Sequence, residues 1–402
     1  MATSLAPLRI FLLDLLPTVP YYAAALALAL KQAGASVTFG LTTYWLDKDH
    51  FRARGLEPAP CLVDIAALLP ARPAWLRRLL KLAEALANLL ILAVCWTFRP
   101  QEIVHVQFLS LWLRGMPFEL WLLTWARRRG SRLVYTVHDL LPHDTGRRHF
   151  TRYARLYSHF DALICHSESV RSRLHEEFSI PLERIWVLPH GPLFRGSEIA
   201  DSSLALTRLG YAPGTELVLW QGIIHPYKGV LFLLDAWVQV AAQRPHARLL
   251  IAGIPAAAAP DHAVEITNRI AQLGLAESVR SDYRYLPEEE LQACYAAAAV
   301  VVYPYREIST SGALMTGLGQ GKAVIATRLP AFDEILTNGE NALLVDFGDA
   351  DALAAAILRL LDDAALRHRL EQAARAEADR RGWENIALRT LDHYRSLKGA
   401  PS

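Results

Sequence analysis

Two loops of this chain carry residues suited to holding a diphosphate. One loop, His225–Gly229, follows Gly222 and the apolar run 217–220, and the other, Ser309–Gly312, follows the apolar run 300–303. Helix-like patterns begin directly after both. The start of a helix presents backbone N–H groups, and the helix dipole favours an anion there. A lysine in one loop and three hydroxyl residues in the other therefore predict a diphosphate site.

The elements that must position these loops alternate between short apolar strands and helices. In the first half, strands are expected near 8–13, 36–41, 103–106, 132–137, 162–165 and 185–188. In the second half, they are expected near 216–221, 248–252, 279–283, 300–302, 323–326 and 342–345. Continuous apolar strands separated by helices are typical of parallel sheets covered on both faces. The pattern restarts after a stretch rich in Gly, Pro and Ser, so it predicts two successive doubly wound α/β domains.

The two loops resemble those of the retaining nucleotide-sugar glycosyltransferases of the group 1, or family 4, type, which have the GT-B fold. That family shows Gly-Arg-(x)-Lys-Gly in the first loop, and Glu-(x)7-Glu followed by Gly-(x)-Pro-Val in the second. Gly222 and Lys228-Gly229 match the first motif, and the segment 321–326 fits the end of the second. The resemblance extends over nearly the whole chain.

Several positions depart from the family motifs. Ile223 stands where the family has the arginine, and Ile308 and Thr316 stand where it has the two glutamates. Glu307 lies one position out of register with the first glutamate. In the family the second glutamate holds the ribose hydroxyls, so this chain must recognise the ribose in another way.

The resemblance implies two Rossmann-like domains that face a central cleft. We expect an amino-terminal acceptor-binding domain at 1–195, a linker at 196–213 and a nucleotide-sugar-binding domain at 214–382. A final helix at 383–397 is expected to pack back on the first domain.

The resemblance also assigns roles to residues of the second domain. The expected donor-diphosphate ligands are Gly222, His225, Lys228, Ser309, Thr310, Ser311 and Gly312. Lys228, expected in an exposed loop, would stabilise charge on the leaving diphosphate, and we count it as catalytic. His225 either replaces the missing arginine or is an ordinary loop residue. Thr316, Arg284 and Tyr285 are expected beside the donor nucleoside and sugar, and Glu307 is a further catalytic candidate.

In the first domain, His138 follows the strand 132–137, at the edge where open α/β sheets bind ligands. The family has a histidine in this segment, so we count His138 as a catalytic candidate. Asp139 either orients His138 or caps the next segment. The expected acceptor side comprises Asp139, Pro20, Tyr21 and Tyr22, and the two tyrosines either stack on a sugar ring or pack in the core. His105 and the turn at 189–191 are interpreted mainly as structural.

Metal and redox chemistry find little support in the sequence. Of two Asp-x-Asp matches, Asp47-Lys48-Asp49 follows no strand and Asp349-Ala350-Asp351 is expected to cap a helix. We therefore expect no metal and no cofactor beyond the sugar-nucleotide substrate. The 4 cysteines are scattered, which is typical of reduced thiols in a cytoplasmic protein.

Charge and hydropathy suggest a partner surface. Residues 1–200 carry 23 basic and 16 acidic side chains, whereas the rest carry 19 basic and 24 acidic. A basic amphipathic helix at 72–98, with Arg72, Arg77, Arg78 and Lys81, either packs on the sheet or meets an anionic membrane. The expected location is cytoplasmic, with the inner face of the cytoplasmic membrane as a second candidate. The sequence has no dense Lys/Arg run with interleaved aromatic residues, so binding to nucleic acid is not expected.

These observations favour a metal-independent glycosyltransferase. It would move a sugar from a nucleoside-diphosphate donor to a hydroxyl acceptor, either a carbohydrate or a lipid-linked intermediate, with retention of the anomeric configuration. Two alternatives stay open: a sugar-nucleotide epimerase of the same architecture, and a catalytically weak nucleotide-sugar-binding protein.

Overall fold

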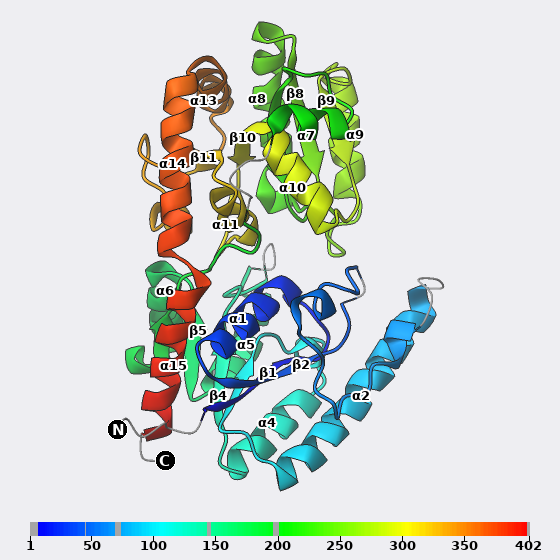
Figure 1. Cartoon of the computed structure of the whole chain (residues 1–402), viewed down its shortest axis with the longest axis vertical. Helices are drawn as coiled ribbons and strands as arrows, with labels where there is room; N and C mark the ends of the chain where they lie inside the picture. Colours follow the sequence, from blue (N-terminus) through cyan, green and yellow to red (C-terminus); the bar gives the residue numbers. More distant parts are fainter. Residues whose placement is uncertain (1–6, 45, 69–73, 143–145, 196–200, 400–402) are drawn as a thin grey trace. The chain divides into compact units, whose positions relative to one another are not determined.

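The computed structural model describes residues 7–44, 46–68, 74–142, 146–195 and 201–399. Its contacts divide the chain into two compact units. The first unit comprises Met1–Pro189 and Trp383–Ser402, and the second comprises His190–Gly382. Each unit is an α/β structure built on one parallel sheet (Figure 1).

The sheet of the first unit has six strands in the order β2-β1-β3-β4-β5-β6. The strands are β1 (Arg9–Asp14), β2 (Ser36–Leu41), β3 (Ile103–Val106), β4 (Arg132–Thr136), β5 (Ala162–Cys165) and β6 (Ile185–Val187). The longer helices of this unit are α1 (Pro20–Gln32), α2 (Ala74–Phe98), α4 (Phe118–Arg128), α5 (Phe150–Ser158) and α6 (Glu168–Phe178). Strands β1, β3 and β5 are almost entirely buried, as their continuous apolar runs predict.

The sheet of the second unit has the order β12-β11-β10-β7-β8-β9. Its strands are β7 (Glu216–Gln221), β8 (Ala247–Ala252), β9 (Val279–Asp282), β10 (Ala298–Tyr303), β11 (Ala323–Thr327) and β12 (Leu343–Val345). Its helices of eight or more residues are α8 (Val230–Gln243), α9 (His262–Gln272), α10 (Glu288–Ala297), α11 (Gly312–Gly319), α13 (Ala350–Asp362) and α14 (Ala364–Arg380). β8 and β9 extend the sheet on one side of β7, whereas β10, β11 and β12 extend it on the other, so the order of strands switches between β7 and β10. Ligands of open α/β sheets bind outside the carboxyl ends of the strands at such a switch point.

Each unit has its own hydrophobic core. In the first, Phe11 of β1 packs edge-on against Trp96 of α2, with 5.1 Å between ring centroids. In the second, Trp220 and Trp237 are fully buried between the sheet and α8. Both loops of the expected diphosphate site therefore begin on strands fixed by a packed core.

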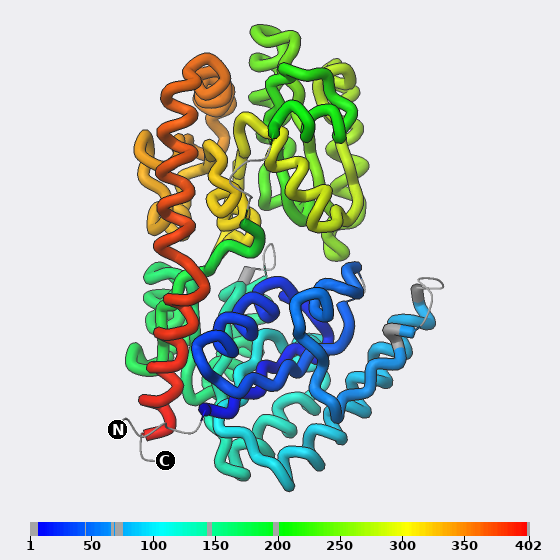
Figure 2. Tube along the Cα trace, viewed as in Figure 1, coloured from blue at the N-terminus to red at the C-terminus, as the bar shows by residue number. Residues whose placement is uncertain are grey.

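The last helix, α15 (Trp383–Gly399), belongs to the first unit although the preceding α14 belongs to the second. It runs beside α1, as the red and blue segments of Figure 2 show. Tyr22 of α1 contacts the Trp383 ring at 5.1 Å, and the Tyr394 hydroxyl lies 2.6 Å from His105 Nδ1. Buried aromatic and polar contacts thus hold this helix on the first unit.

Two segments differ from the sequence prediction. The expected linker 196–213 contains a helix, α7 (Ser202–Arg208), which packs against α10 within the second unit. Asp201 caps this helix by accepting from the amides of Ser203 and Leu204, so the short polar residues begin a helix here. The basic face expected on the helix at 72–98 does not include Lys81, because this side chain points inward to Asp64. Arg72, which was also expected on that face, lies outside the described residues.

Candidate active site

The two loops that the sequence singled out meet at the switch point of the second sheet. Strands β7 and β10 are neighbours, with Val218 beside Val300. The amide of Arg306, after β10, donates to the carbonyl of Tyr227, after β7, at 2.7 Å. Gly229 has a φ of 68°, and a Cβ there would lie 1.8 Å from the carbonyl oxygen of Pro304. The close approach of the two loops therefore depends on glycine at this position.

Lys228 is the cation of this site, and it is buried. It ends a short 3₁₀ turn, Pro226–Lys228, and only 9% of its surface is exposed. Its ammonium Nζ lies 5.4 Å from the ring centroid of Tyr305. A Cβ on Gly222 would lie 3.2 Å from the same nitrogen. The expectation of an exposed lysine was wrong, because Gly222 and Tyr305 enclose the ammonium, and an ammonium removed from water favours a nearby anion.

The hydroxyl-rich loop leads into helix α11. Ser311 is the N-cap residue, and its Oγ accepts from the amide of Leu314 at 3.1 Å. The amides of Gly312 and Ala313 belong to the first two residues of α11, just before Leu314, and lie at the positive end of the helix dipole. Ser309 and Thr310 are partly exposed before the cap. This arrangement provides amide and hydroxyl donors next to a buried cation.

His190 is a residue of this site that the sequence interpretation treated as part of a structural turn. A Cβ on Gly312 would lie 3.7 Å from His190 Nε2 and 2.9 Å from a methyl of Leu193. His190 Nδ1 lies 2.7 Å from the carbonyl of Gly191 and donates to it, because a carbonyl only accepts. The other ring nitrogen therefore faces the start of α11. Residues 190 and 312 are far apart in the sequence, so no local pattern predicted this contact.

The two residues nearest the family's glutamate positions are placed differently from each other. Glu307 is exposed, with its carboxylate 3.8 Å from Arg306. Thr316 is buried, and its hydroxyl donates to the carbonyl of Gly312 at 2.8 Å. The Thr316 hydroxyl is thus used within its own helix.

Buried tyrosines fix α11 to the sheet. The Tyr303 hydroxyl donates to the carbonyl of Ala313 at 2.7 Å, and Tyr295 donates to Gln221 Oε1 at 3.0 Å. The two hydroxyls lie 3.3 Å apart. Burial raises the pKa of Tyr303 well above its usual value, so its phenol stays protonated. These bonds hold the start of α11 against the ends of β7 and β10.

Arg284 and Tyr285 lie in the loop after β9. Arg284 Nε is 2.9 Å from Asp282 Oδ1, and a terminal nitrogen of the same side chain pairs with Glu290. Arg284 also lines a cavity of about 290 Å³ together with Arg208 and Arg280. Tyr285 is partly exposed. Their assignment to the donor nucleoside stays a prediction.

In the first unit, His138 ends a chain of hydrogen bonds at the carboxyl edge of the sheet. His138 Nε2 lies 3.1 Å from Gln107 Oε1, and Gln107 Nε2 lies 3.0 Å from His105 Nε2. His105 Nε2 also contacts the Thr136 hydroxyl at 2.7 Å. Burial holds the pKa of His105 at about 3, so this imidazole is neutral. The chain therefore positions His138 through neutral hydrogen-bonding groups.

The expected acceptor residues are mostly packed. Tyr22 is buried, with its ring 4.7 Å from that of His138 in an edge-on arrangement. Tyr21 contacts the His50 ring at 4.6 Å, and Pro20 is buried at the first position of α1. Asp139 lines a cavity of about 200 Å³ with Arg152 and Tyr153.

Asp14, at the end of β1, was not singled out from the sequence. Its Oδ2 accepts from the amides of Thr18 and Val19, at 2.8 and 3.2 Å. Burial raises the pKa of this carboxyl to about 7. Asp14 thereby holds the loop that leads into α1 and its expected acceptor residues.

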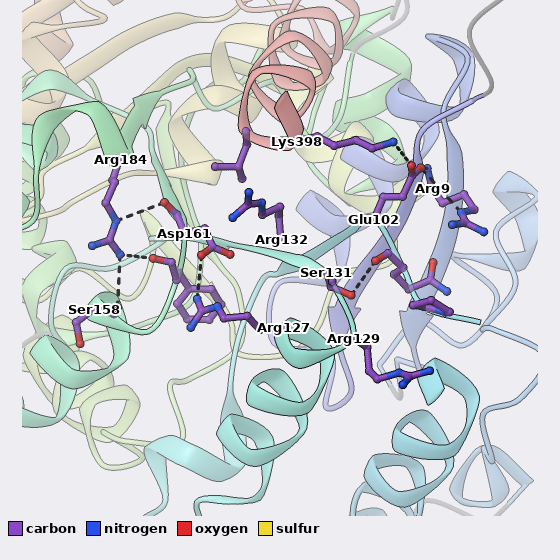
Figure 3. A pocket seen from close by; sticks show the side chains of 15 residues that line it. Arg9, Glu102, Arg127, Arg129, Ser131, Arg132, Ser158, Asp161, Arg184 and Lys398 are labelled. Carbon is purple, nitrogen blue, oxygen red and sulfur yellow. Dashed lines mark hydrogen bonds and ion pairs between the residues drawn. The ribbon is translucent and has the colours of Figure 1, made fainter. Parts of the chain in front are cut away.

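Another cavity lies elsewhere, at the amino-terminal edge of the first sheet (Figure 3). It has a volume of about 910 Å³, and its lining includes Arg9, Arg127, Arg129, Arg132, Arg184 and Lys398. Several of these cations are already paired: Arg127 with Asp161, and both Arg9 and Lys398 with Glu102. Because ligands of open α/β sheets bind at the opposite edge, we place the site at the loops described above.

The described residues include no group of three or more His, Cys, Asp or Glu side chains arranged to hold a metal ion. Asp349 caps α13 by accepting from the amide of Ala352 at 2.9 Å, which confirms the helix-cap interpretation of that Asp-x-Asp match.

Both halves of the chain match known protein families. Residues 215–363 match the family described as "Glycosyl transferases group 1", and residues 19–191 match "Glycosyltransferase Family 4". The chain belongs to the group 1 glycosyltransferases. The resemblance to the group 1, or family 4, type is thereby confirmed, whereas retention of the anomeric configuration stays a prediction.

Relatives and solved structures agree with this assignment. A D-inositol 3-phosphate glycosyltransferase from Nocardioides sp. is 28% identical over 247 residues, which is 59% of this chain and 54% of the relative. Anabaena HepE in complex with UDP and glucose has a TM-score of 0.75 at 18% identity, with coverage of 97% and 100%. Sucrose-phosphate synthase from Thermosynechococcus elongatus has a TM-score of 0.73 at 21% identity, with coverage of 98% and 100%. These structures confirm the α/β GT-B fold, whereas the match to the first relative spans little more than half of its length.

Proposed function

We propose that this group 1 glycosyltransferase transfers a sugar from a nucleoside-diphosphate donor to a hydroxyl acceptor, with retention of the anomeric configuration. The observation that carries this proposal is the ammonium of Lys228, enclosed by Gly222 and Tyr305 beside the start of α11. Negative charge develops on the leaving diphosphate during transfer, and a fixed cation with amide donors stabilises it. The UDP complexes of Anabaena HepE make UDP-sugars the first donors to test.

In this proposal, each candidate residue has a defined part. Lys228 and the segment Ser309–Gly312 bind the diphosphate, with His225 and Gly222 beside them. Glu307 borders the donor sugar, whereas Arg284, Tyr285 and Thr316 lie toward the nucleoside. His138 lies near the reacting sugar and the acceptor, with Asp139 and the α1 start on the acceptor side. The acceptor is a carbohydrate or a lipid-linked intermediate, and the reaction proceeds in the cytoplasm.

Retention fits the lack of any assigned general base. The acceptor proton passes to the departing phosphate oxygen, while the new bond forms on the face that the phosphate leaves. This route requires only that the cationic pocket hold the leaving group.

One observation favours the alternative of nucleotide-sugar binding without turnover. Thr316 offers no carboxylate to the ribose, and its hydroxyl is bonded within α11. A donor that lacks a carboxylate contact to its ribose hydroxyls binds more weakly. An experiment must therefore distinguish a slow transferase from a protein that only binds the donor.

Incubation with labelled UDP-sugars and a panel of hydroxyl acceptors separates the possible activities. A glycosylated acceptor, or slow release of sugar and UDP, supports the transferase. A donor recovered as its epimer would show an epimerase, and donor binding with no chemical change would show a binding protein. The anomeric coupling constant of the product in an NMR spectrum reports retention or inversion.

We also propose that transfer needs no metal, because Lys228 and the amides of α11 supply the positive charge. Activity should then be unchanged in excess EDTA. Loss of activity in EDTA, restored by Mn²⁺ or Mg²⁺, would contradict this part of the proposal.

A further inference from the structure

The outer face of helix α2 is apolar and exposed over most of its length. Its large side chains are between 56% and 80% exposed: Trp75, Leu79, Leu90, Val94 and Phe98. Ala83 and Ala87, also exposed, continue the row between them. Spacings of three and four residues place these side chains on one side of a helix. Soluble monomers rarely expose an apolar surface of this extent without a partner.

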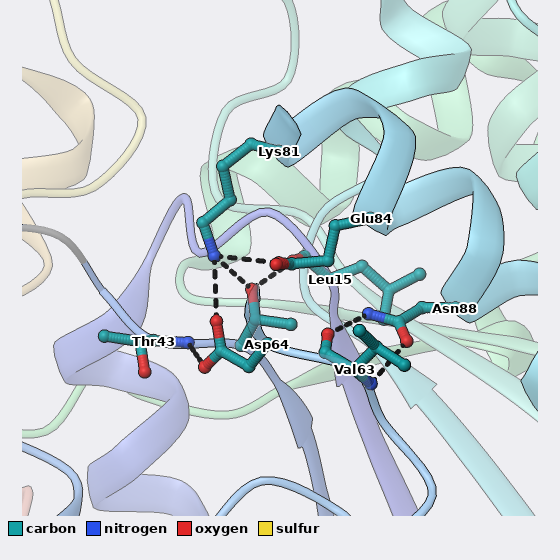
Figure 4. A network of polar contacts seen from close by, with 8 residues as sticks. Leu15, Thr43, Val63, Asp64, Lys81, Glu84 and Asn88 are labelled. Carbon is teal, nitrogen blue, oxygen red and sulfur yellow. Dashed lines mark hydrogen bonds and ion pairs between the residues drawn. The ribbon is translucent and has the colours of Figure 1, made fainter. Parts of the chain in front are cut away.

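Lys81, Glu84 and Asn88 of α2 lie on its inner side (Figure 4). Lys81 Nζ contacts Thr42, Asp64 and Glu84 at 3.1, 3.2 and 3.0 Å. Asn88 exchanges two hydrogen bonds of 2.8 Å with the backbone of Val63. The helix therefore shows its apolar side outward, the reverse of an ordinary surface helix.

This inner network bears on how the helix meets a bilayer. The segment Trp75–Phe98 is long and apolar enough to cross a membrane by composition alone. However, Lys81, Glu84 and Asn88 are tied into the first unit, and Leu92 and Trp96 are buried in its core. Extracting the helix would leave a buried ion pair and an amide without partners, which is costly. The helix can therefore lie on a membrane surface without leaving the fold.

Helix α4 extends the apolar face. Trp125 Nε1 donates to the hydroxyl of Thr97 in α2 at 3.1 Å, and Arg129 donates to the Thr97 carbonyl at 2.7 Å. Beside this contact, Trp121 is exposed, as is Phe118. Tryptophan concentrates at membrane interfaces, because its ring is apolar and its N–H is polar.

Cations border the face at both ends. Exposed Arg78 lies in its first turn on α2, between Trp75 and Leu79, and exposed Arg99 follows it. Exposed arginines at 127–129 end α4. Between Arg78 and Arg99 the charged residues are Lys81 and Glu84, both on the inner side. An apolar face bordered by arginines complements an anionic lipid surface.

We propose that the outer face of α2 and α4 binds the surface of an anionic lipid bilayer, with α2 lying in the plane of the interface. The apolar row enters the headgroup region, and the flanking arginines contact lipid phosphates. Lys81 takes no part, so the surface differs from the basic face that the sequence suggested. This inference stands apart from the transfer reaction and is tested without any sugar donor.

The test is flotation of the full chain with vesicles of mixed phosphatidylglycerol and phosphatidylcholine. In the test variant, exposed face residues are changed together: Leu79→Gln, Leu90→Gln, Val94→Gln and Trp121→Gln. In the control, the same number of exposed apolar residues outside the face are changed: Leu182→Gln, Leu204→Gln, Val264→Gln and Leu388→Gln. The wild type and the control should float, whereas the test variant should lose partitioning by on the order of tenfold or more. Circular dichroism checks that all three proteins are folded.

Further measurements decide the nature of the partner. Flotation should fall with added salt and with vesicles of phosphatidylcholine alone, because both weaken the arginine contacts. Brominated lipids should quench tryptophan fluorescence in the wild type more than in the Trp121→Gln single variant. A wild type that ignores anionic vesicles would overturn the proposal, as would equal flotation of the test variant. Face-dependent dimerisation in sedimentation equilibrium without vesicle binding would assign the face to a second copy instead.

Discussion

The two units place different side chains at the same edge of the same kind of sheet. In the second unit, the loops after β7 and β10 gather a buried ammonium, hydroxyls and the start of α11. In the first unit, the strand ends carry a neutral chain of hydrogen bonds from Tyr394 through His105 and Gln107 to His138. A cationic pocket suits a diphosphate, whereas neutral donors and acceptors suit the hydroxyls of an acceptor.

The comparison teaches that topology fixes where a site lies and side chains fix what it binds. Gly229 permits the close contact of two loops in the second unit. Asp14, buried and bonded to two amides, holds the corresponding loop in the first. If the account is correct, changes in the second unit should affect the donor, and changes in the first should affect the acceptor.

The largest effect is expected from removing the cation. Lys228→Met keeps the length of the side chain beside Tyr305 and removes its charge, so turnover should fall by on the order of 10²-fold or more. Steady-state kinetics with the identified donor measures this effect. Lys31→Met, at an exposed lysine of α1, is the matched control and should keep full activity. Near-normal turnover in a folded Lys228→Met protein would contradict the assignment of the donor diphosphate to the second unit.

A smaller effect is expected from crowding the cation. Gly222→Ala places a methyl group 3.2 Å from the present position of Lys228 Nζ, so the ammonium must shift by a few tenths of an ångström. The φ of 156° at this position also strains any residue other than glycine. Donor affinity should weaken by about tenfold, the scale of modest overpacking. Isothermal titration calorimetry with UDP measures this change. An unchanged dissociation constant would contradict this prediction.

A change in the first unit should act on the acceptor. His138→Phe keeps the ring packed against Tyr22 but removes the bond to Gln107. The loss of one hydrogen bond should lower kcat/KM for the acceptor by up to about tenfold. UDP affinity should stay as in the wild type. Equal losses for donor and acceptor would mean that His138 serves both substrates.

The smallest effect concerns stability and pH. The pKa of Asp14 is raised to about 7, so the folded state prefers the protonated carboxyl. The stabilisation is therefore complete below the unfolded-state pKa near 4 and is lost as pH rises through 7. Asp14→Asn mimics the neutral form, and its Tm relative to the wild type should rise by a few degrees between about pH 5 and pH 8. Thermal unfolding across that range tests the sign, and a falling difference would contradict it.

Much of the fold was predictable because each strand is a continuous apolar run with turn residues after it. Twelve strands were expected, and all twelve lie within about two residues of the observed bounds. The two loops of the second unit were also expected to share a site, since both begin at strand ends.

Other features depend on contacts that no local pattern encodes. The burial of Lys228 requires Tyr305 and Gly222, and the approach of His190 to Gly312 joins distant segments. The inward direction of Lys81 depends on Asp64, which lies in a separate loop. The helix in the expected linker was missed because short polar residues were interpreted as loop, although Asp201 caps α7 there.

The most direct test of the central claim is UDP binding to the wild type, Lys228→Met and Lys31→Met by isothermal titration calorimetry in EDTA. The account predicts binding by the wild type and Lys31→Met, and a dissociation constant raised by on the order of tenfold or more in Lys228→Met, the scale of one lost charge-assisted hydrogen bond. Equal affinity in all three proteins would show that the pocket at Lys228 does not hold the diphosphate.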